Sequence, residues 1–290
     1  MPLAFYSSKG DTDMENKLYH QIENTNLYEF FSKVYESEKG EHEPPHFHKN
    51  FEILTVISGK CRYCVGENEF TVCEGECIFV LPFQIHSFFL EENTSVLCTT
   101  FHEHLILSLS QTFEGKRPKD PLFRPSKEVS RFFLDQIRSL FGNDSGYIKR
   151  ISPTYVRMKV KGVLYMLGSE FLAQVELTDE KRADSVVMHT VQYIAEKFKS
   201  DLSLHDVAQE TGYNYQYLSR TFNKTIGINF KKLLNRFRVE YAYALLQDTD
   251  LPLGQIAFES GFQSIRSFNA VFLETFKKSP KEVRKSVKIN

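Results

Sequence analysis

The sequence lacks any apolar run long enough to cross a membrane, which takes about 18 residues. Residues 1–20 also lack the hydrophobic region that a secretory signal peptide needs. Cysteine is scarce: the five cysteines are an odd number, and without a secretion signal we expect them to be reduced thiols. These absences predict a cytoplasmic protein that has no membrane partner.

Motifs for the common kinds of enzyme chemistry are absent as well. The chain has no phosphate-binding loop, no nucleophile elbow and no paired-carboxylate site that rises above background. We therefore expect no enzymatic activity and no cofactor. Its 290 residues, 41% of them hydrophobic, are nevertheless enough for two domains with sizeable cores.

A strong overall charge is missing too, since the formal net charge is −1. The charge is divided unevenly along the chain: residues 184–290 carry a net charge of +4, and residues 1–183 carry −5. This difference is modest. It is compatible with chance, and it also supports a C-terminal part that faces phosphate groups.

One pattern occurs twice in the last hundred residues. The two copies are offset by 49 residues up to a shared glycine and by 50 residues after it. The first copy contains Leu202, Leu204, Val207, Ala208, Gly212, Leu218 and Phe222, and the second contains Leu251, Leu253, Ile256, Ala257, Gly261, Phe268 and Phe272. A repeat of this length indicates a duplicated supersecondary unit.

Each copy predicts two helices joined by a short turn that contains the glycine. Gly212 stands where a left-handed C-cap ends the first helix, and the second helix is expected from Tyr215 to Lys224. The second copy predicts helices from Gln255 to Ser260 and from Ile265 to Thr275. This arrangement is a helix-turn-helix, whose second helix enters the major groove of DNA.

A helix without Gly or Pro is expected between the copies, from Phe230 to Gln247. Its length of about 27 Å follows from the rise of 1.5 Å per residue. A rod of this length could hold two recognition helices about one DNA turn, roughly 34 Å, apart on one face of a duplex.

The C-terminal third resembles the DNA-binding domain of the AraC/XylS family of bacterial transcription regulators. The matching segments are Leu204–Ala208, Tyr217–Phe222, Gly227, Ile256–Phe262, Ser267–Phe268 and Ser279–Pro280. In the most usual architecture of this family, a ligand-binding and dimerising domain lies on the N-terminal side. The resemblance therefore implies a two-domain α+β protein.

Short strands are predicted in the N-terminal part. An early strand is expected at Leu27 to Tyr35, and the polar segment from Glu36 to Pro45 is expected to be a loop because it ends in two prolines. The strands that follow are expected at Glu52 to Ile57, Cys61 to Val65, Phe70 to Cys73, Cys77 to Leu81, Phe88 to Leu90 and Ser95 to Phe101. Strands of this length, with turns between them, predict a small barrel or sandwich.

Three histidines and a glutamate on these strands resemble the cupin signature. They are His46, His48, Glu52 and His86, and Gly59 and Pro82 have matching positions. The second half of the signature departs from the family pattern, because Gln84 stands where a glycine is usual. In metal-using cupins these four residues bind a divalent ion, whereas in AraC-type regulators the barrel more usually binds a small organic effector. We interpret them as an effector pocket without metal, and keep a metal site and plain structural roles as alternatives.

Other motifs with metal-binding spacing have plainer interpretations. Cys61 and Cys64 are three apart in a predicted strand, so their side chains point to opposite faces, and a small buried hydrophobic role suits the cysteines better than zinc. His102, Glu103 and His104 follow the last strand and open a helix expected from His104 to Leu109, where exposed polar residues are common.

Two further helices are expected, from Ser126 to Phe141 and from Pro153 to about Val175, after a loop at residues 111–121. The second carries an apolar stripe of Val156, Val160, Val163, Leu164, Leu167 and Phe171. The resemblance implies that this stripe packs two subunits together; the alternative is that it covers its own barrel. We expect a linker from Leu177 to Asp184 and three parts: an effector barrel (1–125), a dimerisation segment and linker (126–182) and a DNA-binding domain (183–290).

The predicted recognition helices expose polar side chains opposite their buried stripes. We expect DNA contacts from Asn214, Gln216, Ser219, Arg220, Gln263, Ser264, Ile265, Arg266 and Asn269. Arginine and glutamine can make paired hydrogen bonds with base edges. Ala270 departs from the family, in which several relatives have a long polar residue there.

These observations predict a sequence-specific transcription regulator that responds to a small molecule, such as a sugar, bound in the barrel. The expected partners are double-stranded promoter DNA, the effector, RNA polymerase and a second copy of the chain. Two alternatives remain: a metal-dependent cupin sensor or enzyme fused to a DNA-binding domain, and a constitutive regulator whose barrel only dimerises.

Overall fold

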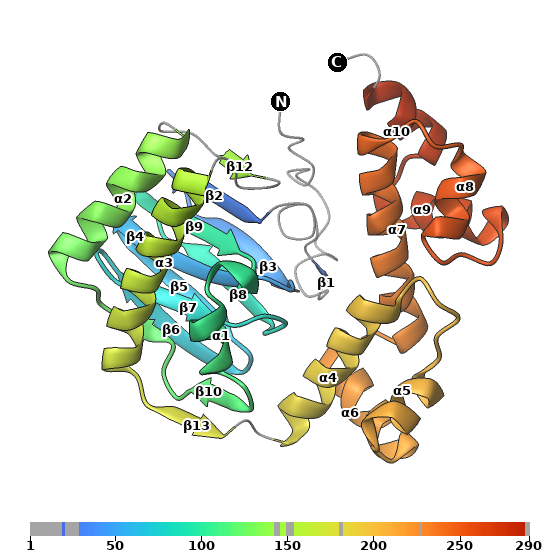
Figure 1. The fold of residues 1–290 in the computed structure, drawn as a ribbon, viewed down its shortest axis with the longest axis horizontal. Helices are drawn as coiled ribbons and strands as arrows, with labels where there is room; N and C mark the ends of the chain where they lie inside the picture. Colours follow the sequence, from blue (N-terminus) through green and yellow to red (C-terminus); the bar gives the residue numbers. More distant parts are fainter. Residues whose placement is uncertain are drawn as a thin grey trace.

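The computed structural model describes residues 19–20, 29–141, 146–148, 154–179, 182–226 and 228–287. A β-rich N-terminal part lies beside an all-helical C-terminal part (Figure 1), which confirms the predicted fold class. Within the described ranges, no helix is both long and apolar enough to span a bilayer.

The strands of the described residues form two large sheets and a small one. The first sheet has the order β1 (Tyr19–His20), β3 (Glu41–Phe47), β8 (His86–Leu90), β5 (Lys60–Val65) and β6 (Asn68–Cys73). The second has the order β11 (Leu122–Phe123), β7 (Cys77–Val80), β4 (Phe51–Ser58), β9 (Thr94–Phe101), β2 (Phe30–Ser37) and β12 (Gly146–Ile148). A small antiparallel pair joins β10 (Lys116–Pro118) to β13 (Leu177–Asp179).

Strand β4 shows why the second sheet is buried on both faces. Alternate side chains point to opposite faces of a strand. Leu54 and Val56 belong to the apolar cluster between the two sheets, whereas Phe51 and Ile53 belong to the cluster under the helices. Both faces of the second sheet therefore need a covering layer. The first sheet supplies it on one side only.

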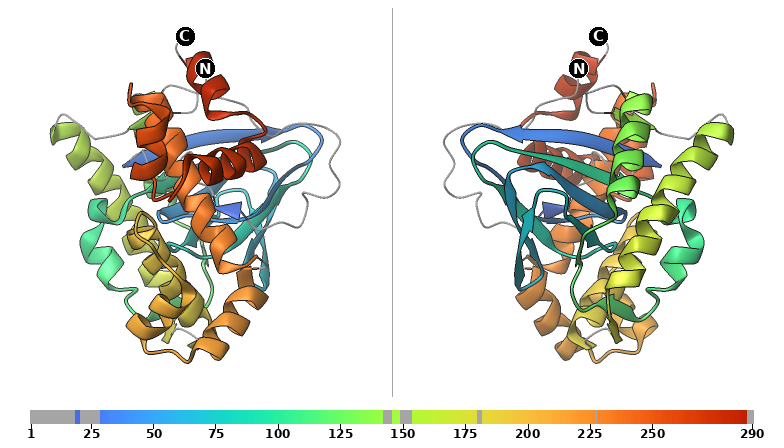
Figure 2. Two further views of the ribbon diagram at one scale, coloured as in Figure 1. Left: turned by 90° about the vertical axis from the view of Figure 1, so that its right-hand side faces the viewer. Right: turned by 90° about the vertical axis from the view of Figure 1, so that its left-hand side faces the viewer.

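Two helices cover the outer face of this sheet, α2 (Lys127–Phe141) and α3 (Thr154–Gln174). Figure 2 shows them side by side across the strands. The Phe171 ring of α3 stacks on Phe79 of β7 with a centroid distance of 4.6 Å. A 3-10 turn, η1 (Glu103–Leu105), and a short helix, α1 (Leu107–Gln111), stand where one helix was predicted from His104 to Leu109.

The apolar stripe predicted for dimerisation faces this sheet. Val160, Val163, Leu164, Leu167 and Phe171 are all buried in the cluster that α3 shares with the barrel. The alternative interpretation, that the stripe covers its own barrel, therefore describes these residues. The opposite face of α3 is also apolar: Tyr155, Met158, Tyr165 and Met166 are exposed.

Two segments predicted as loops contain strands. The segment from Glu36 to Pro45 was expected to be a loop, but β3 runs through it. The pairing of β3 with β8 shifts register between Glu43 and His46, and the two prolines, which have no N–H to donate, lie in that irregularity. The expected loop at residues 111–121 contains β10, and the expected linker starts with its partner β13. The predicted break from Gly142 to Gly146 lies mostly outside the described residues, as does Gly227.

The C-terminal part consists of helices whose bounds follow the repeat closely. They are α4 (Arg182–Lys197), α5 (Leu204–Thr211), α6 (Tyr215–Ile226), α7 (Phe230–Asp248), α8 (Leu253–Glu259), α9 (Ile265–Phe276) and α10 (Pro280–Val287). Each copy of the repeat has its own core. Leu233, Leu234 and Phe237 of α7 pack in the first core, and Val239, Ala242 and Leu246 pack in the second.

The barrel contributes side chains to the first helical core. Phe47, 1% exposed, lies in the same apolar cluster as Val187, Val191 and Leu218 of the helical part. Phe83 and Ile85, on the loop before β8, pack against this cluster. The two parts of the chain thus meet in an apolar contact.

The packing of α3 leads to a test. Leu167→Ala should lower the free energy of unfolding by about 2–5 kcal/mol, because it removes a fully buried side chain and leaves a cavity. Arg131→Ala, at an exposed position of the neighbouring helix α2, should change it by less than about 0.5 kcal/mol. Urea unfolding of both variants measures the difference, and equal losses would show that α3 does not face the sheet as described.

Candidate functional site

The first helix-turn-helix is held by a cap at each end of α5. Ser203 Oγ accepts a hydrogen bond from the Asp206 N–H at 3.3 Å, and the Asp206 carboxylate accepts one from the Ser203 N–H at 2.7 Å. This capping box satisfies two N–H groups that would otherwise lack partners. Gly212 ends the helix with φ of 70°, in the left-handed region predicted for it.

The recognition helices α6 and α9 are capped at equivalent positions of the repeat. The Asn214 side-chain oxygen accepts hydrogen bonds from the N–H groups of Gln216 and Tyr217, at 3.0 and 3.2 Å. Ser264 Oγ accepts one from the Ser267 N–H at 3.2 Å. These oxygens are engaged within the protein, so Asn214 and Ser264 orient their helices.

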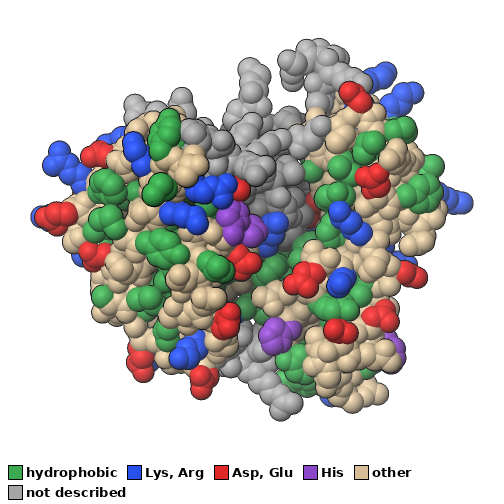
Figure 3. Space-filling model, in the orientation of Figure 1, with side chains coloured by type: hydrophobic (Ala, Val, Ile, Leu, Met, Phe, Trp, Pro, Cys, Tyr) green, Lys and Arg blue, Asp and Glu red, His purple; other side chains and the backbone are tan. Residues whose placement is uncertain are grey.

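The residues predicted to contact DNA lie on the side of each recognition helix that faces away from the cores. In α6, Leu218 and Phe222 are buried, Gln216 and Arg220 are exposed, and Ser219 is half-buried. In and before α9, the exposed residues are Gln263, Ser264, Ile265, Arg266 and Asn269, and Ala270 lies beside them. Arg220 Nε donates to the Gln216 carbonyl at 3.3 Å, so this side chain lies along its own helix. On the face drawn in Figure 3, acidic and basic side chains are mixed over the helical part.

The cupin-like residues His46, His48, Glu52 and His86 come together inside the barrel. One side-chain atom of each lies within 4.8 Å of one from every other, and all four residues are 1% exposed. The register of the first sheet places His46 directly opposite His86, and Glu52 comes from β4 in the second sheet. The convergence expected from their spacing is therefore present in the structure.

The three imidazole rings are oriented by main-chain carbonyls. The Nδ1 atoms of His46, His48 and His86 lie 2.9, 2.9 and 2.8 Å from the carbonyl oxygens of Pro44, Asn50 and Gln84. A carbonyl can only accept, so each Nδ1 donates its N–H, and a ring in its neutral form has its lone pair on Nε2. His86 Nε2 has no hydrogen-bond partner and lies 3.6 Å from Glu52 Oε2.

Glu52 is the centre of this group. Its Oε2 lies 3.0 Å from His48 Nε2, and its Oε1 accepts a hydrogen bond from the Tyr63 hydroxyl at 2.7 Å. Burial acts to raise the pKa of Glu52, but His86 and His48 outweigh it and hold the pKa well below its usual range. Burial lowers the pKa of His48, and burial together with the other two histidines lowers that of His46. Metal binding requires an ionised carboxylate and neutral imidazoles, and the directions of these pKa shifts for Glu52, His46 and His48 agree with that requirement.

A divalent metal ion fits these residues chemically. Imidazole and carboxylate are suitable ligands for such ions, and carbonyl groups that hold Nδ1 are the usual outer partners of histidine ligands. His46, His48, His86 and Glu52 would hold the ion, which could polarise a ligand oxygen. From the sequence we expected an effector pocket without metal here, with a metal site as an alternative.

Two further polar residues inside the barrel were missed in the sequence. Tyr63 holds Glu52 in place, and Thr100 lies directly opposite Glu52 on β9, where its buried hydroxyl has no hydrogen-bond partner. Neither belongs to a motif. Their places become visible only in the folded chain, because the register of β9 brings Thr100 beside Glu52 and the packing of the two sheets brings Tyr63 to it.

The remaining metal-like motifs have structural surroundings. Cys61 is buried and Cys64 is half-exposed, as expected for opposite faces, and burial raises the pKa of Cys61 to about 12. His102 accepts a hydrogen bond from the His104 N–H at 3.3 Å and so caps the 3-10 turn. Burial, together with Lys49 and His104, lowers the pKa of His102 to about 4.

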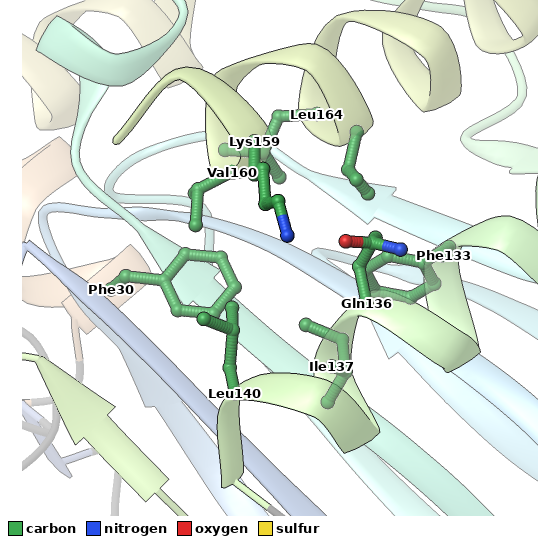
Figure 4. Close-up of a pocket in the computed structure, with 9 residues that line it drawn as sticks. Phe30, Phe133, Gln136, Ile137, Leu140, Lys159, Val160 and Leu164 are labelled. Carbon is green, nitrogen blue, oxygen red and sulfur yellow. The ribbon is translucent and has the colours of Figure 1, made fainter. Parts of the chain in front are cut away.

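A pocket outside the barrel lies between β2, α2 and α3 (Figure 4). Its lining is apolar except for Gln136 and Lys159, and its volume is about 10 Å³. That volume is roughly what one water molecule needs. This crevice is therefore too small for an organic effector.

Comparisons with known proteins assign both parts of the chain. Residues 33–101 match the model of a cupin domain, and residues 207–286 match the model of a helix-turn-helix domain. The chain is 22% identical over 265 residues to the melibiose operon regulatory protein of Escherichia coli, a match that covers 83% of each protein.

Two other comparisons cover different lengths. An HTH-type transcriptional regulator of Staphylococcus aureus, itself uncharacterised, is 34% identical over 101 residues, which are 35% of this chain and 14% of the relative. The chain thus matches only a small part of that longer protein. The crystal structure of an apo variant of ToxT from Vibrio cholerae has a TM-score of 0.50 with 19% identity, and the match covers 90% of this chain and 98% of ToxT. This likeness shows that the two chains share a fold.

Proposed function

We propose that this chain, an AraC/XylS-type protein with a cupin domain followed by a double helix-turn-helix domain, regulates transcription by binding promoter DNA. The observation that carries the proposal is the duplicated unit: two capped recognition helices, α6 and α9, each with a buried apolar stripe and an exposed polar face. A single helix-turn-helix would be a weak argument, whereas two on one connecting helix suit two successive turns of a duplex.

The proposed division of labour follows from burial and hydrogen bonding. Gln216, Ser219 and Arg220 of α6 would read one half-site, and the α9 side would use Gln263, Ile265, Arg266 and Asn269. Asn214 and Ser264 would set the angle of each helix and lie near the phosphates, since helix N-termini favour anions. Residues 183–290 would form this DNA-binding domain. The regulator would have no enzymatic activity. It would act in the cytoplasm and would also contact RNA polymerase there.

The Arg220 assignment gives a direct test. Arg220→Ala should weaken binding to a specific site by about 1–3 kcal/mol, the expected loss of a paired contact with a base. Lys224→Ala removes the same charge from the same exposed helix and should weaken specific and random duplexes alike. Fluorescence anisotropy with both kinds of duplex measures the losses. Equal losses for Arg220→Ala would identify a phosphate contact and contradict the assignment.

The barrel, proposed to extend over residues 1–125, would be the sensor of this regulator. A sugar or related metabolite is the proposed effector, supported by the similarity to a protein named for the melibiose operon. Unpaired polar atoms inside the barrel, His86 Nε2 and the Thr100 hydroxyl, offer hydrogen bonds to such a ligand. Because the four cupin-like side chains now contact one another, an organic effector would have to replace those contacts.

A second candidate is that the sensor holds a divalent metal ion at His46, His48, Glu52 and His86. The specific observation in its favour is the orientation of all three rings by carbonyl groups, which directs the Nε2 lone pairs inward. The four ligand atoms are already close enough to surround one ion. A third possibility, a barrel that only dimerises the chain, gives no reason for burying these groups together.

Elemental analysis of the purified protein separates these candidates. The organic-effector proposal expects no stoichiometric transition metal, and expects His86→Ala to abolish the response to the effector while DNA binding persists. The metal proposal expects one divalent ion per chain that is lost in His86→Ala. His42→Ala is the matched control, because His42 is exposed on the same strand pair and should change neither result.

We propose a homodimer that uses the outer face of α3 within the segment 126–182. Tyr155, Met158, Tyr165 and Met166 lie opposite the buried stripe, and Gly162 among them leaves open space for a second helix. A helix that is apolar on both faces needs a partner on each. Charged substitutions at Val163 and Leu167 would disrupt the core of a single subunit and not the contact between subunits, because both side chains are buried.

The dimer proposal predicts that Met158→Glu combined with Met166→Glu gives a folded monomer. Burying the introduced carboxylates between subunits would cost several kcal/mol. Lys161→Glu, at a half-buried position to one side of this face on the same helix, should leave the dimer intact. Sedimentation velocity reports both outcomes, and a wild-type monomer at high micromolar concentration would contradict the proposal.

A further inference from the structure

Arg238 lies in the middle of α7, at the boundary between the two helical cores. Its neighbour Phe237 packs in the first core and its other neighbour Val239 packs in the second. The Arg238 side chain is itself mostly buried, with 8% of the residue exposed. A buried guanidinium needs hydrogen-bond acceptors for its donors, so its partners indicate what it does.

The partners of Arg238 are main-chain carbonyls at the end of α4. Nε donates to the Phe198 carbonyl at 2.7 Å, and Nη2 donates to the Ser200 carbonyl at 2.8 Å. The last carbonyls of a helix have no partners within the helix, and its C-terminus favours positive charge. Phe198 and Ser200 lie just beyond Lys197, the last residue of α4, and the planar guanidinium satisfies both of their carbonyls at once, which a lysine with its single ammonium group would do less well.

The second helix-turn-helix touches the same short segment. Gly261, in the turn between α8 and α9, has φ of +85°, and a Cβ built there would lie 2.7 Å from the Phe198 oxygen and 2.8 Å from Lys199 Cα. The adjacent Phe262 ring has its centroid 5.9 Å from the Arg238 guanidinium. The end of α4, the middle of α7 and the second turn therefore meet at residues 198–200.

This junction gives the two units a second connection. If α7 were the only link, bending of one helix would change the separation and the rotation of α6 relative to α9, because the two cores have no residue in common. The α4 end belongs to the first unit and Gly261 to the second, so their contact restrains both movements. Arg238 holds the α4 end in the position in which the glycine turn fits.

We infer that Arg238 is a positioning residue that fixes the spacing and rotational phase of the two recognition helices on DNA. Arg238 would set the distance between the half-sites indirectly, because its Nε and Nη2 donors bind carbonyls of the protein and not the DNA. The inference rests on the proposed DNA-binding function, which it deepens. The DNA site that this chain binds should therefore have two half-sites at one fixed spacing.

Selection of duplexes from a random-sequence library tests the inference. The full-length wild-type chain should retain duplexes with two half-motifs at one spacing. Arg238→Met keeps the length of the side chain without its donors; it should retain the same half-motifs over several spacings and bind the wild-type spacing about ten- to a hundredfold more weakly. Lys231→Met removes an exposed charge from the same helix and should behave as wild type.

A measurement without DNA separates this inference from the proposed function. Spin labels carried by unnatural amino acids at Asn223 and Leu273, exposed equivalent positions of α6 and α9, report the distance between the two helices. The distance distribution should be narrow in the wild type and in Lys231→Met, and broad in Arg238→Met. If the wild type selects no motif while Arg238→Met still broadens the distribution, the proposed function fails and the junction stands.

Two milder variants keep the test decisive if Arg238→Met does not fold. Arg238→Lys retains the charge but not the paired donors, and should give an intermediate broadening. Gly261→Ala acts from the other side of the junction, where its methyl group would displace the turn from Phe198 and shift the selected spacing. Wild-type distance distributions and wild-type spacing in the folded variants would overturn the inference.

Discussion

The second sheet of the barrel is apolar on both faces, and much of the N-terminal structure follows from that constraint. Its strand β4 sends Phe51 and Ile53 to one side and Leu54 and Val56 to the other, so neither face can be left to water. The first sheet closes one side and leaves an interior. Helices α2 and α3 close the other side, and α3 thereby presents its second apolar face outward. The proposed sensor site and the proposed dimer surface are thus consequences of covering the same strands.

The polar cluster inside the barrel is expensive in isolation, since burying a carboxylate without partners costs several kcal/mol. Glu52 offsets part of this cost by accepting a hydrogen bond from the Tyr63 hydroxyl, and the histidines offset theirs by donating Nδ1–H to main-chain carbonyls. The group is nevertheless incompletely satisfied, because His86 Nε2 and the Thr100 hydroxyl have no hydrogen-bond partner. Unsatisfied groups in such a place are unusual in a merely structural network and are what a ligand would satisfy.

Features that depend on local spacing were predictable from the sequence, and those that depend on register were not. The helix-turn-helix units follow from apolar positions at helical spacing and from the positive φ of Gly212 and Gly261. The four cupin-like residues were found because they form a motif. Strand β3 was missed because Pro44 and Pro45 normally break a strand, whereas here they occupy a register shift. Arg238 has no motif, and its importance appears only when the end of α4 is brought against α7.

Phe47 stands between two histidines of the barrel cluster, yet its ring is part of the first helical core. The first core of the helical part is therefore completed by a side chain from the barrel. A fragment cut out at residues 183–290 would expose to water the apolar side chains that this ring covers, at a cost of about 25 cal/mol for each Å² of apolar surface. The net stability of a domain is only of order 5–15 kcal/mol, so an exposed apolar surface of this kind matters. Excising the helices for separate study would thus yield a less stable protein than the same helices in the full chain.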